Sequence, residues 1–151
     1  MRQFNSIDEI LDFAINSEQR AVNFYNYWAR RTNNNEMREI FEGFAREEMQ
    51  HKARLVKMKE DKIFIAKNEK VPDLKISSYT AKVKPAEEMT YSEALVLAMQ
   101  REKSAFKLYT DIATQLEDSG LRAVFLSLAQ EEAKHKLRFE LEYDENVLRE
   151  N

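Results

Sequence analysis

Residues 47–54, EEMQHKAR, recur 84 positions later as residues 131–138, EEAKHKLR. Both histidines of the chain lie in these segments, each three residues after a glutamate: His51 follows Glu48, and His135 follows Glu132. Residues three apart lie on the same face of a helix, so each segment is expected to present a carboxylate beside an imidazole. Two such pairs would supply a large part of the ligands of a dinuclear metal site.

The offset of 84 residues extends far beyond the two histidine segments. It relates Glu18 to Glu102, so each half of the chain also contributes a further glutamate at an equivalent place. Self-similarity at a fixed spacing indicates one supersecondary unit written twice, here a helical hairpin. Other identical pairs at this offset are Leu11 and Leu95, Ala14 and Ala98, Ala21 and Ala105, Tyr25 and Tyr109, Phe41 and Phe125, Ala45 and Ala129, and Glu47 and Glu131.

Length and composition predict a single domain over residues 1–151. A chain of 151 residues is ordinary for one hydrophobic core, and each half is too short to be an independent domain. The chain has 2 glycines and 2 prolines, so few residues interrupt regular structure and long helices are expected.

Composition also excludes several classes of function. No apolar run approaches the roughly 18 residues of a membrane span, and the first residues lack a signal peptide's apolar stretch, so a cytoplasmic protein is expected. The absence of cysteine excludes disulfides, thiolate metal sites and iron–sulfur clusters within this sequence. A net charge of -3 argues against nucleic acid as a partner.

Capping signals predict where the helices begin and end. The segments Ser6-Ile7-Asp8-Glu9 and Thr90-Tyr91-Ser92-Glu93 both have the pattern of a capping box at a helix start. The first helix is expected to end in the turn at residues 33–35. The third is expected to end near Ser119 and Gly120, since glycine suits a helix end.

From these starts the inward positions of the four helices step by three and four residues. The first and third seams are apolar except for Glu18 and Glu102, whereas the second and fourth are interrupted by the Glu-x-x-His pairs. Glu47 and Glu131 fall off the seams and are expected to flank the site. The other seam positions are Ile7, Leu11, Ala14, Ala21, Tyr25, Trp28, Phe41, Phe44, Leu55, Met58, Tyr91, Leu95, Ala98, Ala105, Tyr109, Ile112, Phe125, Leu128 and Phe139.

The segment 63–89 is predicted to be a crossover. A helix of about 26 residues is about 40 Å long, and an extended segment of this length reaches roughly twice that distance. The second and third helices can therefore run parallel, which predicts an all-α, antiparallel four-helix bundle of two hairpins. The apolar residues of the crossover are expected to lie against the bundle; they are Val71, Leu74, Ile76, Tyr79 and Val83.

Four carboxylates on inward seams require compensation. Burying them costs on the order of several kcal/mol per ion unless opposite charge neutralises them. Two divalent cations balance four carboxylates, and two imidazoles supply one nitrogen ligand per ion. Oxygen and nitrogen donors without sulfur suit iron, manganese or zinc. Small alanines beside the ligands leave room for an exogenous small ligand, and Tyr25 and Tyr109 could donate hydrogen bonds to ligand carboxylates.

Each of these features has an explanation that needs no metal. A single Glu-x-x-His pair is common in a glutamate-rich helix, and the tyrosines and alanines could simply be core packing. The shared register and the repeat favour a metal site. One glutamate from each of two helices with Glu-x-x-His from the other two resembles the ferritin-like diiron-carboxylate superfamily. The closest resemblance is to its rubrerythrin-type branch without the rubredoxin domain, from residue 6 to about residue 143. The implied metal ligands are Glu18, Glu48, His51, Glu102, Glu132 and His135.

The resemblance makes Glu48 and Glu132 the expected bridges between the ions and Glu18 and Glu102 the terminal ligands, although spacing by itself does not assign these roles. It implies two iron ions, with manganese or zinc as alternatives, and a non-haem diiron oxidoreductase of rubrerythrin type active in oxidative stress. The substrate would be hydrogen peroxide or dioxygen, and Tyr25 would orient carboxylates or relay protons together with Tyr109.

Two departures from the resemblance bear on mechanism. Rubrerythrins that reduce peroxide commonly carry a further glutamate where this chain has Ala105, so redox-linked iron movement is not expected here. The cysteine-rich iron module is also missing, which implies a separate electron donor. A homodimer is expected; Phe24 and Phe106 lie off the seams and could form its surface, although packing against the crossover explains them equally well.

Two other classes of function stay open on the sequence. A ferroxidase or iron-handling protein would need a large hollow assembly, and no fifth helix of the kind found in ferritin cages is predicted. A metal-binding structural bundle, with a vestigial site or one filled by zinc, is disfavoured because both halves keep their three ligands, which completes the set of six.

Overall fold

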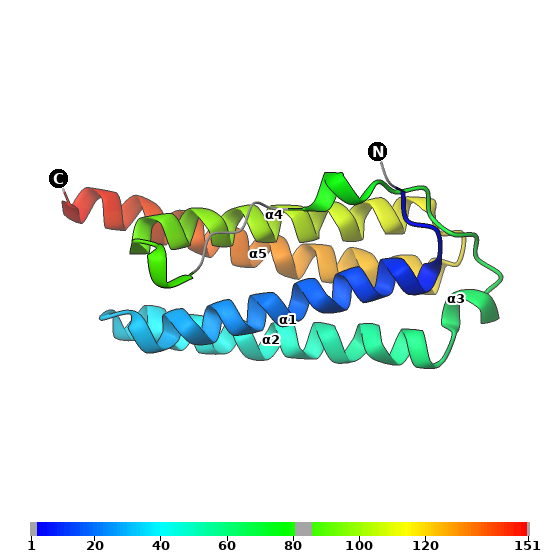
Figure 1. Ribbon diagram of the computed structural model, residues 1–151, viewed down its shortest axis with the longest axis horizontal. Coiled ribbons are helices and arrows are strands. Elements are labelled where there is room, and N and C mark those ends of the chain that lie inside the picture. Colours follow the sequence, from blue (N-terminus) through cyan, green and yellow to red (C-terminus); the bar gives the residue numbers. More distant parts are fainter. Residues whose placement is uncertain (1–2, 81–85, 151) are drawn as a thin grey trace.

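The structure, a computed structural model, describes residues 3–80 and 86–150. Figure 1 shows two helical hairpins side by side, one made of α1 and α2 and the other of α4 and α5. The predicted all-α four-helix bundle of paired hairpins is confirmed. The long helices are α1 (Ile7–Arg31), α2 (Asn35–Glu60), α4 (Tyr91–Gln115) and α5 (Ser119–Glu150), and the short ones are α3 (Ile63–Ala66), η1 (Ile76–Tyr79) and η2 (Ala86–Glu88).

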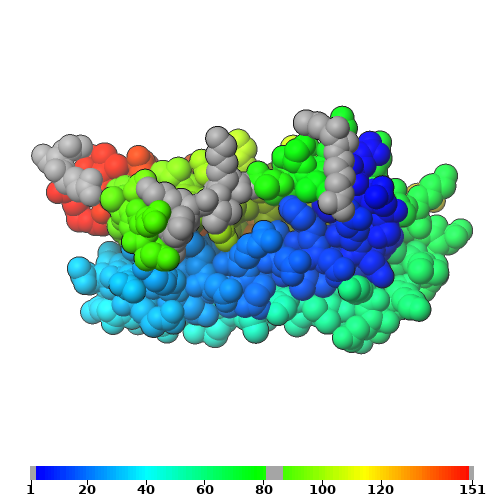
Figure 2. Space-filling model, in the orientation of Figure 1, coloured from blue at the N-terminus to red at the C-terminus, as the bar shows by residue number. Residues whose placement is uncertain are grey.

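The connection between the hairpins returns along the bundle, so that α2 and α4 run in the same direction, as predicted (Figure 1). Residues 81–85 of this crossover, including Val83, lie outside the described residues. Leu74 and Tyr79 are buried against the bundle, and the carbonyl of Leu74 accepts a hydrogen bond from the backbone N–H of Phe4 at 3.1 Å. This contact ties the start of the chain to the crossover, and Figure 2 shows the dark blue start of the chain next to the green crossover.

The expectation that all apolar crossover residues face the bundle is wrong for Val71, which is 44% exposed. The chain is extended here, and successive side chains of an extended segment point to opposite sides. Pro72 and Leu74 point inward. Val71 therefore faces solvent.

The predicted helix starts are confirmed. The hydroxyl of Ser6 accepts a hydrogen bond from the backbone N–H of Glu9 at 3.0 Å. At α4 the capping box is complete, because Thr90 and Glu93 each accept from the other's backbone N–H. Between α1 and α2, the side chain of Asn34 caps the second helix. These caps satisfy backbone donors that a helix start otherwise leaves unpaired.

The predicted end of the third helix near Ser119 and Gly120 is wrong, because α4 ends earlier and these residues begin α5. The side chain of Asp118 accepts a hydrogen bond from the backbone N–H of Leu121 at 2.9 Å. Asp118 thus acts as an N-cap, and Gly120 lies in the first turn of α5 without the positive φ of a helix stop.

The core forms two apolar layers with polar residues between them. One layer surrounds Leu11 and Phe125, and the other surrounds Tyr25, Phe41 and Phe139. Along each long helix the buried glutamates and histidines fall between the two layers, except for Glu142, which lies beyond Phe139 on α5. Among the described residues, no helix is both long and apolar enough to cross a membrane.

The cap at Asp118 generates a stability prediction. Asp118→Ala should lower the free energy of unfolding by about 1 kcal/mol, because a donor at the start of α5 loses its acceptor. Chemical denaturation would measure the change. Asp118→Asn is the control, since asparagine caps a helix as well as aspartate but removes the charge that lies 3.8 Å from Lys67. Equal losses in both variants would assign the effect to the ion pair instead.

Candidate metal centre

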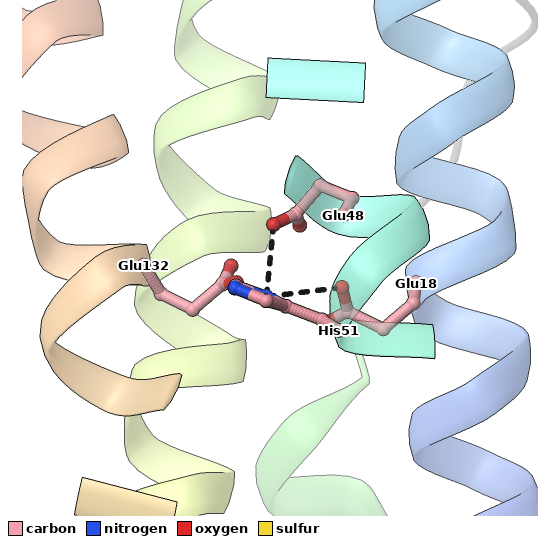
Figure 3. Close-up of side chains that lie close together, drawn as sticks. All are labelled: Glu18, Glu48, His51 and Glu132. Carbon is pink, nitrogen blue, oxygen red and sulfur yellow. Dashed lines mark ion pairs between the residues drawn. The ribbon is translucent and has the colours of Figure 1, made fainter. Parts of the chain in front are cut away.

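The six ligands predicted from the sequence converge at the middle of the bundle. Glu18 comes from α1 and Glu102 from α4, while α2 and α5 each contribute a Glu-x-x-His pair. None of the six is more than 3% exposed. Figure 3 shows Glu18, Glu48, His51 and Glu132 pointing toward one another from three helices.

The side chains form two overlapping groups, in each of which the candidate ligand atoms all lie within 4.8 Å of one another. Glu48 and Glu132 belong to both groups, whereas Glu18 and Glu102 each belong to one. One group is Glu18, Glu48, His51 and Glu132; the other is Glu48, Glu102, Glu132 and His135.

The two imidazoles present Nδ1 to the carboxylates. Nδ1 of His51 lies 2.8 Å from Oε1 of Glu132 and 3.2 Å from Oε1 of Glu48. Nδ1 of His135 lies 3.6 Å from carboxylate oxygens of both Glu48 and Glu102. In each ring, Nδ1 is therefore the atom placed to bind a metal ion.

The other nitrogen of each ring pairs with a glutamate of the opposite hairpin. Nε2 of His51 lies 2.8 Å from Glu131 of α5, and Nε2 of His135 lies 2.8 Å from Glu47 of α2. Glu47 and Glu131 thus flank the centre as expected, but sequence spacing did not show that they cross between hairpins. Phe44 also stacks on the ring of His135, with centroids 3.8 Å apart.

The predicted tyrosines also bond across the hairpins. The hydroxyl of Tyr109 donates to Oε1 of Glu18 at 2.7 Å, and the hydroxyl of Tyr25 donates to Oε1 of Glu102. Both carboxylates are held on one oxygen only. Their second oxygens have no hydrogen-bond partner among the described residues.

Unsatisfied polar atoms show that the cluster fits metal ions. The described residues include eight buried side-chain nitrogen or oxygen atoms that make no well-directed hydrogen bond, and six of them lie on the six predicted ligands. This holds even for Nδ1 of His51 and Oε1 of Glu132, which are 2.8 Å apart. Leaving such an atom unsatisfied costs about 1–3 kcal/mol, and two divalent cations would compensate the whole set. The six atoms are Oε2 of Glu18, Oε1 of Glu48, Nδ1 of His51, Oε2 of Glu102, Oε1 of Glu132 and Nδ1 of His135.

In the absence of cations, protons take over part of the neutralisation. Burial, with the charges of Glu102 and Glu18, raises the pKa of Glu48 to about 8. Burial by itself would lower the pKa of His51, but its contacts with Glu18 and Glu48 outweigh burial and raise the pKa to about 10. The contacts of His135 with Glu102 likewise raise its pKa to about 9 against the effect of burial.

These pKa values predict that metal binding releases protons. At pH 7 the metal-free cluster holds protons on Glu48, His51 and His135, and metal ligands must be deprotonated. The apparent affinity for Zn²⁺ should therefore rise between pH 6 and pH 9. Calorimetric titration in two buffers of different ionisation enthalpy would measure the release, and identical heats in both buffers would contradict it.

The cross-hairpin contacts predict that Glu47 and Glu131 position the histidines. Glu47→Ala or Glu131→Ala should weaken zinc binding roughly 10- to 100-fold, the effect typical of losing a group that orients a metal ligand. Competition with a chromophoric chelator would measure the affinity. Glu42→Ala, an exposed change on α2, is the matched control and should bind as the parent protein does. Unchanged affinity in both test variants would show that the rings need no such support.

Comparison with known proteins agrees with this geometry. A crystal structure from Thermotoga maritima, described as a ferritin-like diiron-carboxylate protein, superposes with a TM-score of 0.81 at 21% sequence identity. The match covers 97% of this chain and 99% of that one, and it shows that the fold is ferritin-like. No curated protein matches the sequence. The rubrerythrin family model matches residues 9–143, so the chain belongs to the rubrerythrin family.

Proposed function

We propose that the protein is a non-haem diiron oxidoreductase that reduces hydrogen peroxide or dioxygen with electrons from a separate donor. The supporting observation is the pair of buried carboxylate and histidine groups that share Glu48 and Glu132. Membership of the rubrerythrin family supports redox chemistry at this centre. Iron is the metal of the proposal, while the donor set also suits manganese or zinc.

The two groups suggest how the residues would divide the ions. Glu18 and His51 would hold one ion, Glu102 and His135 the other, and the two shared glutamates would contact both. When bound, a pair of ferrous ions supplies one electron each, which matches the two electrons that convert hydrogen peroxide to water. The centre lies between the two apolar layers, and none of its six side chains is more than 3% exposed.

Tyr25 and Tyr109 are the proposed catalytic residues besides the ligands. Burial, together with neighbouring carboxylate charge, raises the pKa of both phenols well above the usual value of 10. Both therefore keep their protons near neutral pH and donate them to Glu102 and Glu18. Each phenol holds one oxygen of its carboxylate, so the second oxygen of that carboxylate is free to bind a metal ion. Each phenol also keeps a proton that is hydrogen-bonded directly to a proposed metal ligand.

The wider setting is also part of the proposal. Because this sequence contains no cysteine, electron delivery is assigned to a separate protein or small molecule. The cytoplasm is proposed as the compartment. A homodimer is proposed as the working state. Of the two aromatic residues considered for its surface, Phe106 is 40% exposed, whereas Phe24 is 6% exposed and belongs to the core.

The proposal predicts the outcome of anaerobic loading with ferrous iron followed by hydrogen peroxide. Two ferrous ions should be oxidised per peroxide, much faster than free ferrous iron, in a stopped-flow absorbance measurement. Glu132→Ala should slow the reaction roughly 10-fold or more, because it removes a ligand shared by both groups. Glu39→Ala, which removes an exposed carboxylate of α2, should react as the parent protein does.

Oxidation no faster than that of free iron would remove the peroxidase hypothesis. If dioxygen instead drives uptake of ferric iron far beyond two ions per chain, the result would favour iron handling. Preferential retention of zinc with no redox reaction would favour a structural bundle.

A further inference from the structure

A cavity of about 140 Å³ lies between α1 and α4, directly against the proposed metal centre. By the same measure, roughly 10–15 Å³ is enough to hold one water molecule, so the cavity is several times larger than hydrogen peroxide or dioxygen requires. The carboxylates that line it are Glu18, Glu48, Glu102 and Glu132. A molecule in this cavity would touch the centre itself.

The remaining wall is largely apolar. Phe13 and Leu108 line the cavity, and Ala21 and Ala105 leave space where longer side chains would fill it. Tyr79, at the end of η1, also lines it. Apolar walls beside a few polar groups are typical of sites for organic ligands.

Arg101 places a positive charge at this cavity. Its guanidinium lies 5.2 Å from the centre of the Phe24 ring, and its Nε is buried without a hydrogen-bond partner among the described residues. Arg20 lines the cavity as well and is exposed. Two divalent ions would neutralise the four carboxylates, which would leave the half-buried guanidinium of Arg101 without a compensating negative charge at the cavity.

We propose that this cavity binds a small organic monocarboxylate, with its apolar part beside Ala105 and Leu108 and its carboxylate on Arg101. Guanidinium groups bind carboxylates through strong, charge-assisted hydrogen bonds. The inference rests on the proposed function for the two ions that neutralise the glutamates. It adds a substrate class, because an organic acid held here lies against the same centre as the oxidant.

The test uses protein loaded with zinc, which binds ligands without redox turnover, and hexanoate as the probe. Calorimetric titration should show one saturable site per chain, and hexanol, which has the same carbon chain without the charge, should bind at least roughly 10-fold more weakly. Arg101→Gln should weaken hexanoate binding to a similar extent. Ala105→Leu should abolish binding by filling the cavity.

Matched controls separate these effects from general perturbation. Arg54→Gln and Ala133→Leu make the same changes at exposed positions of α2 and α5 and should leave hexanoate affinity unchanged. Elemental analysis should give the same zinc content in every variant.

Three results would overturn the proposal: no saturable hexanoate binding, equal binding of hexanoate and hexanol, or full affinity in Arg101→Gln. The last result would mean that the probe binds the metal ions alone. The comparison of hexanoate with hexanol uses the parent protein, so it stands even if a variant does not fold. The two proposals can also fail separately. If hexanoate binding is saturable and depends on Arg101 but the iron-loaded protein does not react with peroxide, the proposed function is refuted and the carboxylate-binding site stands.

Discussion

The burial of four carboxylates between two apolar layers is the constraint on which the rest of this structure depends. Charges in such a place must be neutralised, either by protons or by cations. The raised pKa of Glu48 shows that protons neutralise part of this charge in the metal-free protein. The six ligand atoms without a hydrogen bond show that protons do not satisfy the whole cluster. The positions of the helices therefore suit the binding of two cations as well as the packing of the apolar layers.

Neither hairpin can complete the centre alone. Each histidine finds the partner of its Nε2 on the other hairpin, and Tyr25 and Tyr109 also donate across. The tyrosine contacts are buried and the histidine contacts are part-buried. All four are short and directional, so they fix how far one hairpin can slide along the other. Apolar packing alone would tolerate more variation in that register. The duplicated sequence thus yields two halves that each supply what the other lacks.

Much of this arrangement could be predicted from the sequence, because a repeat offset and helical spacing determine which residues share a face. They placed Glu18 and His51 in one centre with their equivalents, while the length of segment 63–89 predicted that α2 and α4 run parallel. Spacing could not show that Asp118 caps α5, since a nearby glycine suggested a helix end instead. It also could not reveal the cavity beside Ala105, because the gap between α1 and α4 depends on packing across the whole bundle.

The two halves differ at the wall of that cavity. The repeat equates Ser17 with Arg101 and Arg20 with Ser104, and all four residues line the cavity, so each half supplies one arginine and one serine. Arg20 is exposed, whereas Nε of Arg101, the neighbour of Glu102, is buried, so the charge beside Glu102 is screened less by solvent. A nearby positive charge stabilises the lower oxidation state of a metal ion. Two ions held by the equivalent sets of ligands would therefore experience unequal electric fields and would have unequal reduction potentials.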